Sequence, residues 1–136
     1  MRVMLFSDTY PPQVNGVANC VYNLAHALHE DGHTVMVCTV LAKRRIRTPQ
    51  HEPFPVIRTR AMPLPMYNDF SLAPPVGLAL TRVVRRFRPD LVHCHTPFSI
   101  GWHGVRACNT YRIPVIGTHH TLFGDYVDSY SRLVIR

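Results

Sequence analysis

With 136 residues, 46% hydrophobic and 17% charged, the chain has the size and composition of one globular domain with a single core, which excludes a disordered or low-complexity protein. We expect no signal peptide and no transmembrane segment, because no apolar run approaches the roughly 20 residues that cross a bilayer. The net charge of +7 is local, since residues 43–88 hold ten of the fifteen Lys and Arg residues and only two acids.

The first part of the chain has the pattern of strand, loop, helix and strand. An apolar run at residues 3–6 predicts a buried strand, and apolar residues at helical spacing from Val17 to Leu28 predict a helix that Gly32 ends. The β-branched segment 34–40 predicts a second strand. Residues 41–75 are basic and then rich in proline, which predicts a long excursion with only a short strand at 56–60.

Strands and helices continue to alternate in the second part. An amphipathic pattern with Leu80, Val83, Val84 and Phe87 on one face predicts a helix that ends before Pro89. The elements predicted after it are a strand at 90–95, a helix at 97–112, a strand at 113–118 and a final helix at 125–135. Alternation of this kind predicts the α/β class, with a doubly wound, mostly parallel sheet.

Three polar segments follow predicted strands: residues 7–16, 95–101 and 118–124. Ligands of doubly wound sheets bind at the carboxyl ends of the strands, so one crevice is expected to contact all three segments. Asn15 and Gly16 stand where a helix begins, a place that favours anions. A glycine that only makes the turn is the alternative. There is no GxGxxG motif and no acidic residue after the second strand, which argues against a nicotinamide enzyme.

His95, His119 and His120 are candidates for acid–base or electrostatic roles, because imidazole titrates near neutrality and can donate to a sugar hydroxyl or an oxyanion. Purely structural histidines are the alternative. His93 and Cys94 add two further metal-ligand types, but neighbouring strand residues point to opposite faces and no zinc-motif spacing occurs. We therefore predict no metal site.

The basic helix face, Arg82, Arg85 and Arg86, next to the basic segment 42–47, is typical of a surface that meets anionic lipid. An ordinary solvated helix face is the alternative. Nucleic acid is not expected as a partner, because aromatic residues are not interleaved with the basic ones. The widely spaced Cys20, Cys38, Cys94 and Cys108 indicate reduced, mostly buried thiols and a cytoplasmic location.

Two stretches, residues 6–35 and 89–127, together resemble the N-terminal domain of the family 4 retaining glycosyltransferases. The likeness is greatest to diacylglycerol glucosyltransferases and related lipid or phosphatidylinositol mannosyltransferases. It implies a GT-B architecture, in which two Rossmann-like domains hold a nucleotide-sugar between them and the N-terminal domain binds the acceptor. Residues 1–136 would be that acceptor-side domain, and the donor-binding C-terminal domain is not among them.

The resemblance also implies roles for single residues. Gly16 would lie against the donor diphosphate, with Asn15 and Thr121 also on the donor side. His120 would contact the transferred sugar and act as the catalytic residue. Asp8, His95 and His119 would line the acceptor side of the cleft.

The implied partners are a nucleotide-sugar of the UDP-glucose or GDP-mannose type, a diacylglycerol-like lipid acceptor, an anionic membrane surface and the second domain, with no cofactor. Because catalysis needs both walls of the cleft, we expect residues 1–136 alone to be inactive. We expect a cytoplasmic protein, peripheral at the inner face of the plasma membrane. The alternative is a non-catalytic truncated domain that binds an anionic membrane or a partner protein.

Overall fold

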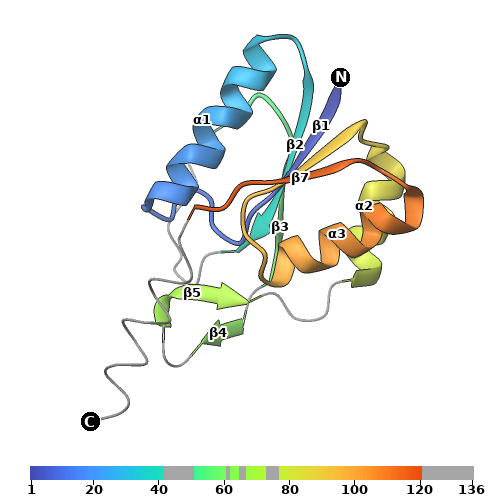
Figure 1. The fold of residues 1–136 in the computed structure, drawn as a ribbon. Coiled ribbons are helices and arrows are strands. Elements are labelled where there is room, and N and C mark those ends of the chain that lie inside the picture. Colours follow the sequence, from blue (N-terminus) through green and yellow to red (C-terminus); the bar gives the residue numbers. More distant parts are fainter. Residues whose placement is uncertain (42–50, 61, 65–66, 73–76, 121–136) are drawn as a thin grey trace.

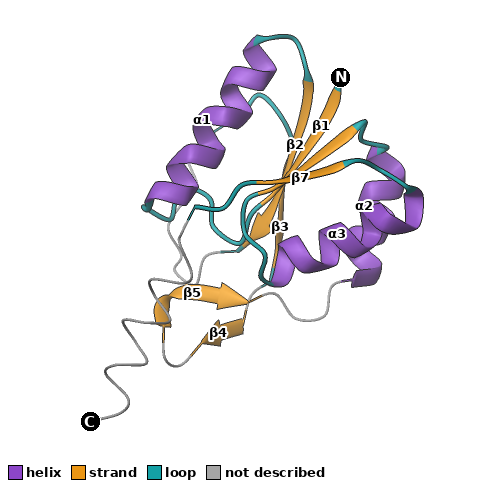
Figure 2. Ribbon diagram, viewed as in Figure 1, coloured by secondary structure: helices purple, strands orange, loops and turns teal. Residues whose placement is uncertain are grey.

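The computed structural model describes residues 1–41, 51–60, 62–64, 67–72 and 77–120. Its main sheet is parallel, in the order β3-β2-β1-β6-β7 (Figure 1). Its strands are β1 (Arg2–Phe6), β2 (Thr34–Val40), β3 (Val56–Thr59), β6 (Leu91–Cys94) and β7 (Val115–Gly117). Helix α1 (Gly16–Glu30) covers one face, and α2 (Gly77–Phe87) and α3 (Ser99–Tyr111) cover the other (Figure 2). The predicted α/β fold with a parallel, doubly wound sheet is confirmed.

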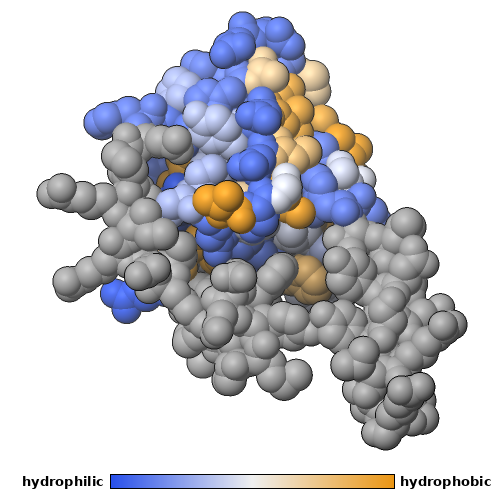
Figure 3. Space-filling model, turned by 90° about the vertical axis from the view of Figure 1, so that its left-hand side faces the viewer, coloured by the Kyte–Doolittle hydropathy of each residue, from blue (hydrophilic) through white to orange (hydrophobic). Residues whose placement is uncertain are grey.

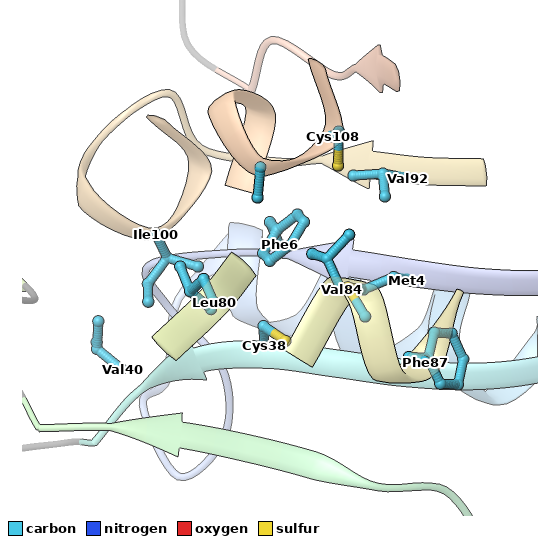
Figure 4. Packing of buried hydrophobic residues seen from close by; sticks show 11 residues of the cluster. Met4, Phe6, Cys38, Val40, Leu80, Val84, Phe87, Val92, Ile100 and Cys108 are labelled. Atoms are coloured by element: carbon cyan, nitrogen blue, oxygen red, sulfur yellow. The ribbon is translucent and has the colours of Figure 1, made fainter. Parts of the chain in front are cut away.

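The alternating side chains of β1 divide the core into two layers. Val3 and Leu5 pack with α1, whereas Met4 and Phe6 pack with α2 and α3. Figure 4 shows Phe6 at the centre of the second layer, between residues of both helices. Because β1 is buried on both faces, it reads in the sequence as one continuous apolar run.

Helix α1 begins and ends where the sequence predicts. The Asn15 side chain caps it by accepting a hydrogen bond of 2.8 Å from the backbone N–H of Ala18. At the other end Gly32 has φ of +83°, the left-handed conformation that follows many helices. Figure 3 shows the molecule from the side on which α1 lies, and hydrophilic residues predominate among the described residues on this face.

The prediction for the middle of the chain was incomplete. Strands β4 (Met62–Leu64) and β5 (Tyr67–Leu72) pair as an antiparallel hairpin within the segment 41–75, where we expected only a short strand at 56–60. The hairpin was missed because Pro63 inside a strand argues against pairing. The predicted helix at 125–135 lies outside the described residues.

Two further expectations concerned the burial of the cysteines and the absence of a transmembrane segment. All four thiols are free, with Cys38 and Cys108 buried, Cys94 partly buried and Cys20 exposed, in line with the expectation of reduced, mostly buried thiols. Among the described helices, none has both the length and the apolar character needed to cross a membrane.

Candidate functional site

The order of the strands reverses between β1 and β6, because the chain moves from β1 outward to β2 and β3 and later returns to the other side. At such a switch point the loops after the two central strands diverge and leave a crevice. Here the loop after β1 leads into α1, and the loop after β6 leads into α3.

A cavity of about 890 Å³ opens at this point. The three polar segments that the sequence singled out all contribute to its wall, through Thr9, Asn15 and Gly16, through residues 94–98, and through residues 117–120. The predicted convergence is therefore confirmed for the described residues. Apolar side chains from α3 and β7 complete the wall: Trp102, Val105, Val115 and Ile116.

Asp8 supports the cavity from outside its wall. Its side chain is only 2% exposed, and it is not among the lining residues. The Thr96 hydroxyl donates to Oδ2 at 2.7 Å, while the hydroxyl of Ser99 and the backbone N–H of Ile100, at 2.9 Å, donate to Oδ1. Because Phe98, at the N-cap of α3, forms no side-chain cap, Asp8 supplies the cap from the end of β1. The structure therefore places Asp8 in a buried clamp instead of at the cleft surface where we expected it.

Asn15 and Gly16 form the α1 edge of the cavity in different ways. The Asn15 side chain is occupied within the protein, since it caps α1 and also donates to Thr9 Oγ1 at 2.7 Å. Gly16 has no positive φ, so the backbone does not need glycine to make a turn. A Cβ at Gly16 would meet nothing within 4 Å. The open space beside a helix N-terminus fits close approach by an anionic ligand rather than a role in the turn.

Three imidazole rings lie in a row at the β6–β7 edge. His93 and His95 have ring centroids 4.0 Å apart, and Nδ1 of His95 lies 2.9 Å from Nε2 of His120. His93 also forms a hydrogen bond of 2.7 Å with Thr118 Oγ1. His119 is exposed and lines the cavity beside His120.

The environment keeps two of these rings neutral. Burial first, and then the neighbouring His93 and His120 rings, lowers the pKa of His95 to about 4. Burial, together with His120, lowers the pKa of His93 as well. His93 and His95 therefore add no positive charge to the site at neutral pH.

The proton positions in the His95–His120 pair follow from what each nitrogen faces. His95 is 3% exposed, and its Nε2 is buried without a hydrogen-bond partner among the described residues. A buried N–H without an acceptor is rarer than an unpaired acceptor, so we assign the proton of His95 to Nδ1, which donates to His120. His120 then carries its own proton on Nδ1. It lines the cavity and has this N–H as its remaining donor.

The remaining predicted site residues are Thr121 and the three arginines of α2. Thr121 lies outside the described residues. Arg82, Arg85 and Arg86 are exposed on α2 and do not line the cavity. The apolar wall on α3 was not anticipated, although Trp102 and Val105 lie about one helical turn apart in the sequence and could have indicated it.

Comparison with protein families decides the broader identity. A family model described as Glycosyltransferase Family 4 matches residues 14–136. The chain belongs to this family. The resemblance of residues 6–35 and 89–127 is thereby confirmed at the level of the family.

Named relatives of this family 4 chain act on lipids or use nucleotide-sugars. It is 35% identical over 127 residues to an alpha-monoglucosyldiacylglycerol synthase of Streptococcus pneumoniae, covering 93% of this chain and 28% of that protein. It is 35% identical over 141 residues to the protein of that name in Acholeplasma laidlawii, covering all of this chain and 34% of the other. A GDP-mannose-dependent alpha-mannosyltransferase of Corynebacterium glutamicum is 28% identical, and the match covers 96% of this chain and 32% of that protein. The chain thus spans about a third of the length of these relatives.

Solved structures support the fold alone. The structure of MurG from Acinetobacter baumannii matches with a TM-score of 0.58 and 16% identity, over 85% of this family 4 chain and 33% of that one. The C-terminal domain of the PF1911 hydrogenase from Pyrococcus furiosus matches with a TM-score of 0.54 and 20% identity. This match covers 86% of this chain and 89% of that domain. At these identities the likeness establishes the α/β architecture and no activity.

Proposed function

We propose that these residues form the acceptor-side domain of a glycosyltransferase that moves a hexose from a nucleotide-sugar to a lipid acceptor, with retention of configuration. Membership of family 4 supports the transfer reaction. The diacylglycerol-directed and GDP-mannose-dependent relatives support the lipid acceptor and the nucleotide-sugar donor. A donor-binding domain beyond residues 1–136 would close the other side of the cavity.

The observation that carries the proposal is that Gly16 and His120 line the same cavity. The open N-terminus of α1 at Gly16 would receive the donor diphosphate, because unpaired N–H groups and the helix dipole favour anions there. Nδ1–H of His120 would donate to a hydroxyl of the transferred sugar. His95 would act as a positioning residue, since its hydrogen bond selects the tautomer of His120.

The apolar wall supports a lipid acceptor. Trp102 is 60% exposed and Ile116 is 47% exposed, although both line the cavity. Exposed apolar side chains beside a polar site suit an amphipathic substrate, whose hydroxyl would approach the histidines while its acyl part contacts this wall.

Turnover of the intact protein tests the proposal. Donors of the UDP-glucose and GDP-mannose type would be offered with diacylglycerol and phosphatidylinositol as acceptors. His120→Ala is expected to lower kcat by about 100-fold, the cost of removing one preorganised donor. His29→Ala is the matched control, because His29 is exposed on α1 and outside the cavity. Near-normal turnover of the His120 variant would remove this residue from the mechanism.

Peripheral membrane binding is a further part of the proposal. Leu80, Val84 and Phe87 are buried on α2, so its exposed face carries Arg82, Arg85 and Arg86. Each cation near an anionic surface contributes about 1 kcal/mol. Replacing the three arginines by glutamine is therefore expected to weaken co-sedimentation with phosphatidylglycerol vesicles.

Two exposed arginines elsewhere provide the control for vesicle binding. Arg106→Gln with Arg112→Gln alters exposed charges associated with α3 and should reduce binding much less. Raising the salt concentration should weaken binding of the wild-type protein, because screening shortens the range of the attraction. Salt-independent binding would contradict a role for the basic face of α2.

A further inference from the structure

Three metal-ligating side chains from separate parts of the chain meet beside the cavity: Cys20 on α1, His95 after β6 and His120 after β7. One ligand atom from each lies within 4.8 Å of the other two. We propose that Cys20, His95 and His120 form a binding site for a zinc-like divalent cation, and that a bound cation withdraws His120 from the donor site.

The geometry is close to what a tetrahedral metal requires. Bonds of about 2.0–2.1 Å to nitrogen and about 2.3 Å to sulfur place ligand atoms roughly 3.3 to 3.6 Å apart. Nδ1 of His95 and Nε2 of His120 are already 2.9 Å apart. No pair of the three ligand atoms exceeds 4.8 Å, and the Cys20 side chain is exposed, so its rotation can close the remaining gap.

The ligand chemistry selects the class of metal. One thiolate and two imidazoles suit Zn²⁺ and its spectroscopic substitute Co²⁺, whereas Mg²⁺ and Ca²⁺ require oxygen ligands. His95 offers either Nδ1 or the buried Nε2 that has no partner among the described residues. Three protein ligands leave a fourth position for water.

A cation in this site would act on the proposed reaction through His120. A metal bond to Nε2 of His120 would replace the hydrogen bond from His95 and draw the ring toward Cys20, which would move its Nδ1–H donor away from the sugar. The inhibitory effect rests on the proposed function, whereas metal binding itself does not.

Cobalt titration tests binding without turnover. The intact, tag-free protein would be stripped with a chelator and titrated with Co²⁺, which gives a near-ultraviolet thiolate-to-metal band and visible bands in tetrahedral sites. The protein is expected to bind one equivalent of Co²⁺, and this binding should depend on Cys20. Cys20→Ser should abolish the near-ultraviolet band and weaken binding at least tenfold, whereas His29→Ala, a change on the same helix, should retain both. Because Cys20 is exposed, Cys20→Ser is expected to fold normally, and circular dichroism of each variant checks this.

The result that overturns the site is the absence of a thiolate band in the wild type, or an equal band in Cys20→Ser. Zn²⁺ inhibition then tests the consequence, with each variant compared with and without the metal. Turnover of the wild type is expected to fall at least tenfold and to return with chelator, and Cys20→Ser should lose this sensitivity. Equal inhibition of both proteins refutes the inhibitory role. An inactive protein with a Cys20-dependent cobalt band supports the site and contradicts the proposed function.

Discussion

Replacing Asp8 measures how strongly the buried clamp holds the β6–α3 loop in place. Asp8 accepts hydrogen bonds from Thr96, Ser99 and Ile100, two of them on Oδ1 and one on Oδ2. Asp8→Ala removes the acceptor from all three donors. Asp8→Asn keeps one oxygen, which can still serve Ser99 and Ile100 from the Oδ1 position.

The expected cost follows from the number of bonds lost. Hydrogen bonds to a charged acceptor contribute about 1.5–3 kcal/mol each, and a buried donor left unpaired costs about 1–3 kcal/mol. These contributions overlap, so we expect Asp8→Ala to lower the free energy of unfolding by about 4 kcal/mol. Asp8→Asn should cost about 2 kcal/mol, because it loses the charge and one acceptor but keeps the cap of α3.

Urea unfolding measured by tryptophan fluorescence provides the assay. Trp102, the single tryptophan of the chain, lies on α3, the helix that Asp8 caps. Asp90→Asn is the matched control, because Asp90 also accepts a backbone N–H, from Arg2 at 2.7 Å, but at an exposed position. It should cost less than about 1 kcal/mol. Equal stability of Asp8→Ala and the control would refute the clamp.

Gly104→Ala should lower the free energy of unfolding by about 1–3 kcal/mol, because its Cβ would lie 2.7 Å from the Phe6 ring. The added Cβ of Gly16→Ala meets nothing within 4 Å, so this variant should leave urea unfolding unchanged. A larger loss of stability in Gly16→Ala than in Gly104→Ala would contradict this packing. His95, with its pKa lowered to about 4 from 6.5, stabilises the fold only while neutral, so this contribution is complete above pH 6.5 and is lost as the pH falls toward 4. Between pH 7 and pH 5 the loss should be about 2 kcal/mol, and a wild-type profile identical to that of His95→Gln would exclude His95 as its source.

Much of the fold could be predicted because its signals are local. The continuous apolar run of β1 marks a strand buried on both faces, and Gly32 marks the end of α1. The hairpin of β4 and β5 could not be found in this way, because pairing depends on a partner strand and Pro63 obscures the pattern.

The sequence alone determined the alternation of strands and helices, and with it the edge of the sheet where polar residues gather. Only the tertiary structure decided what those residues do there. Asp8 and His95 both follow strands, yet Asp8 is enclosed by donors from α3 whereas His95 pairs with His120. Cys20 joins that pair from α1, 75 positions before His95, through helix packing that no local spacing encodes. Periodicity specifies which way a side chain faces, but its neighbours depend on how separate elements pack, and this packing sets the burial, partners and pKa of each candidate residue.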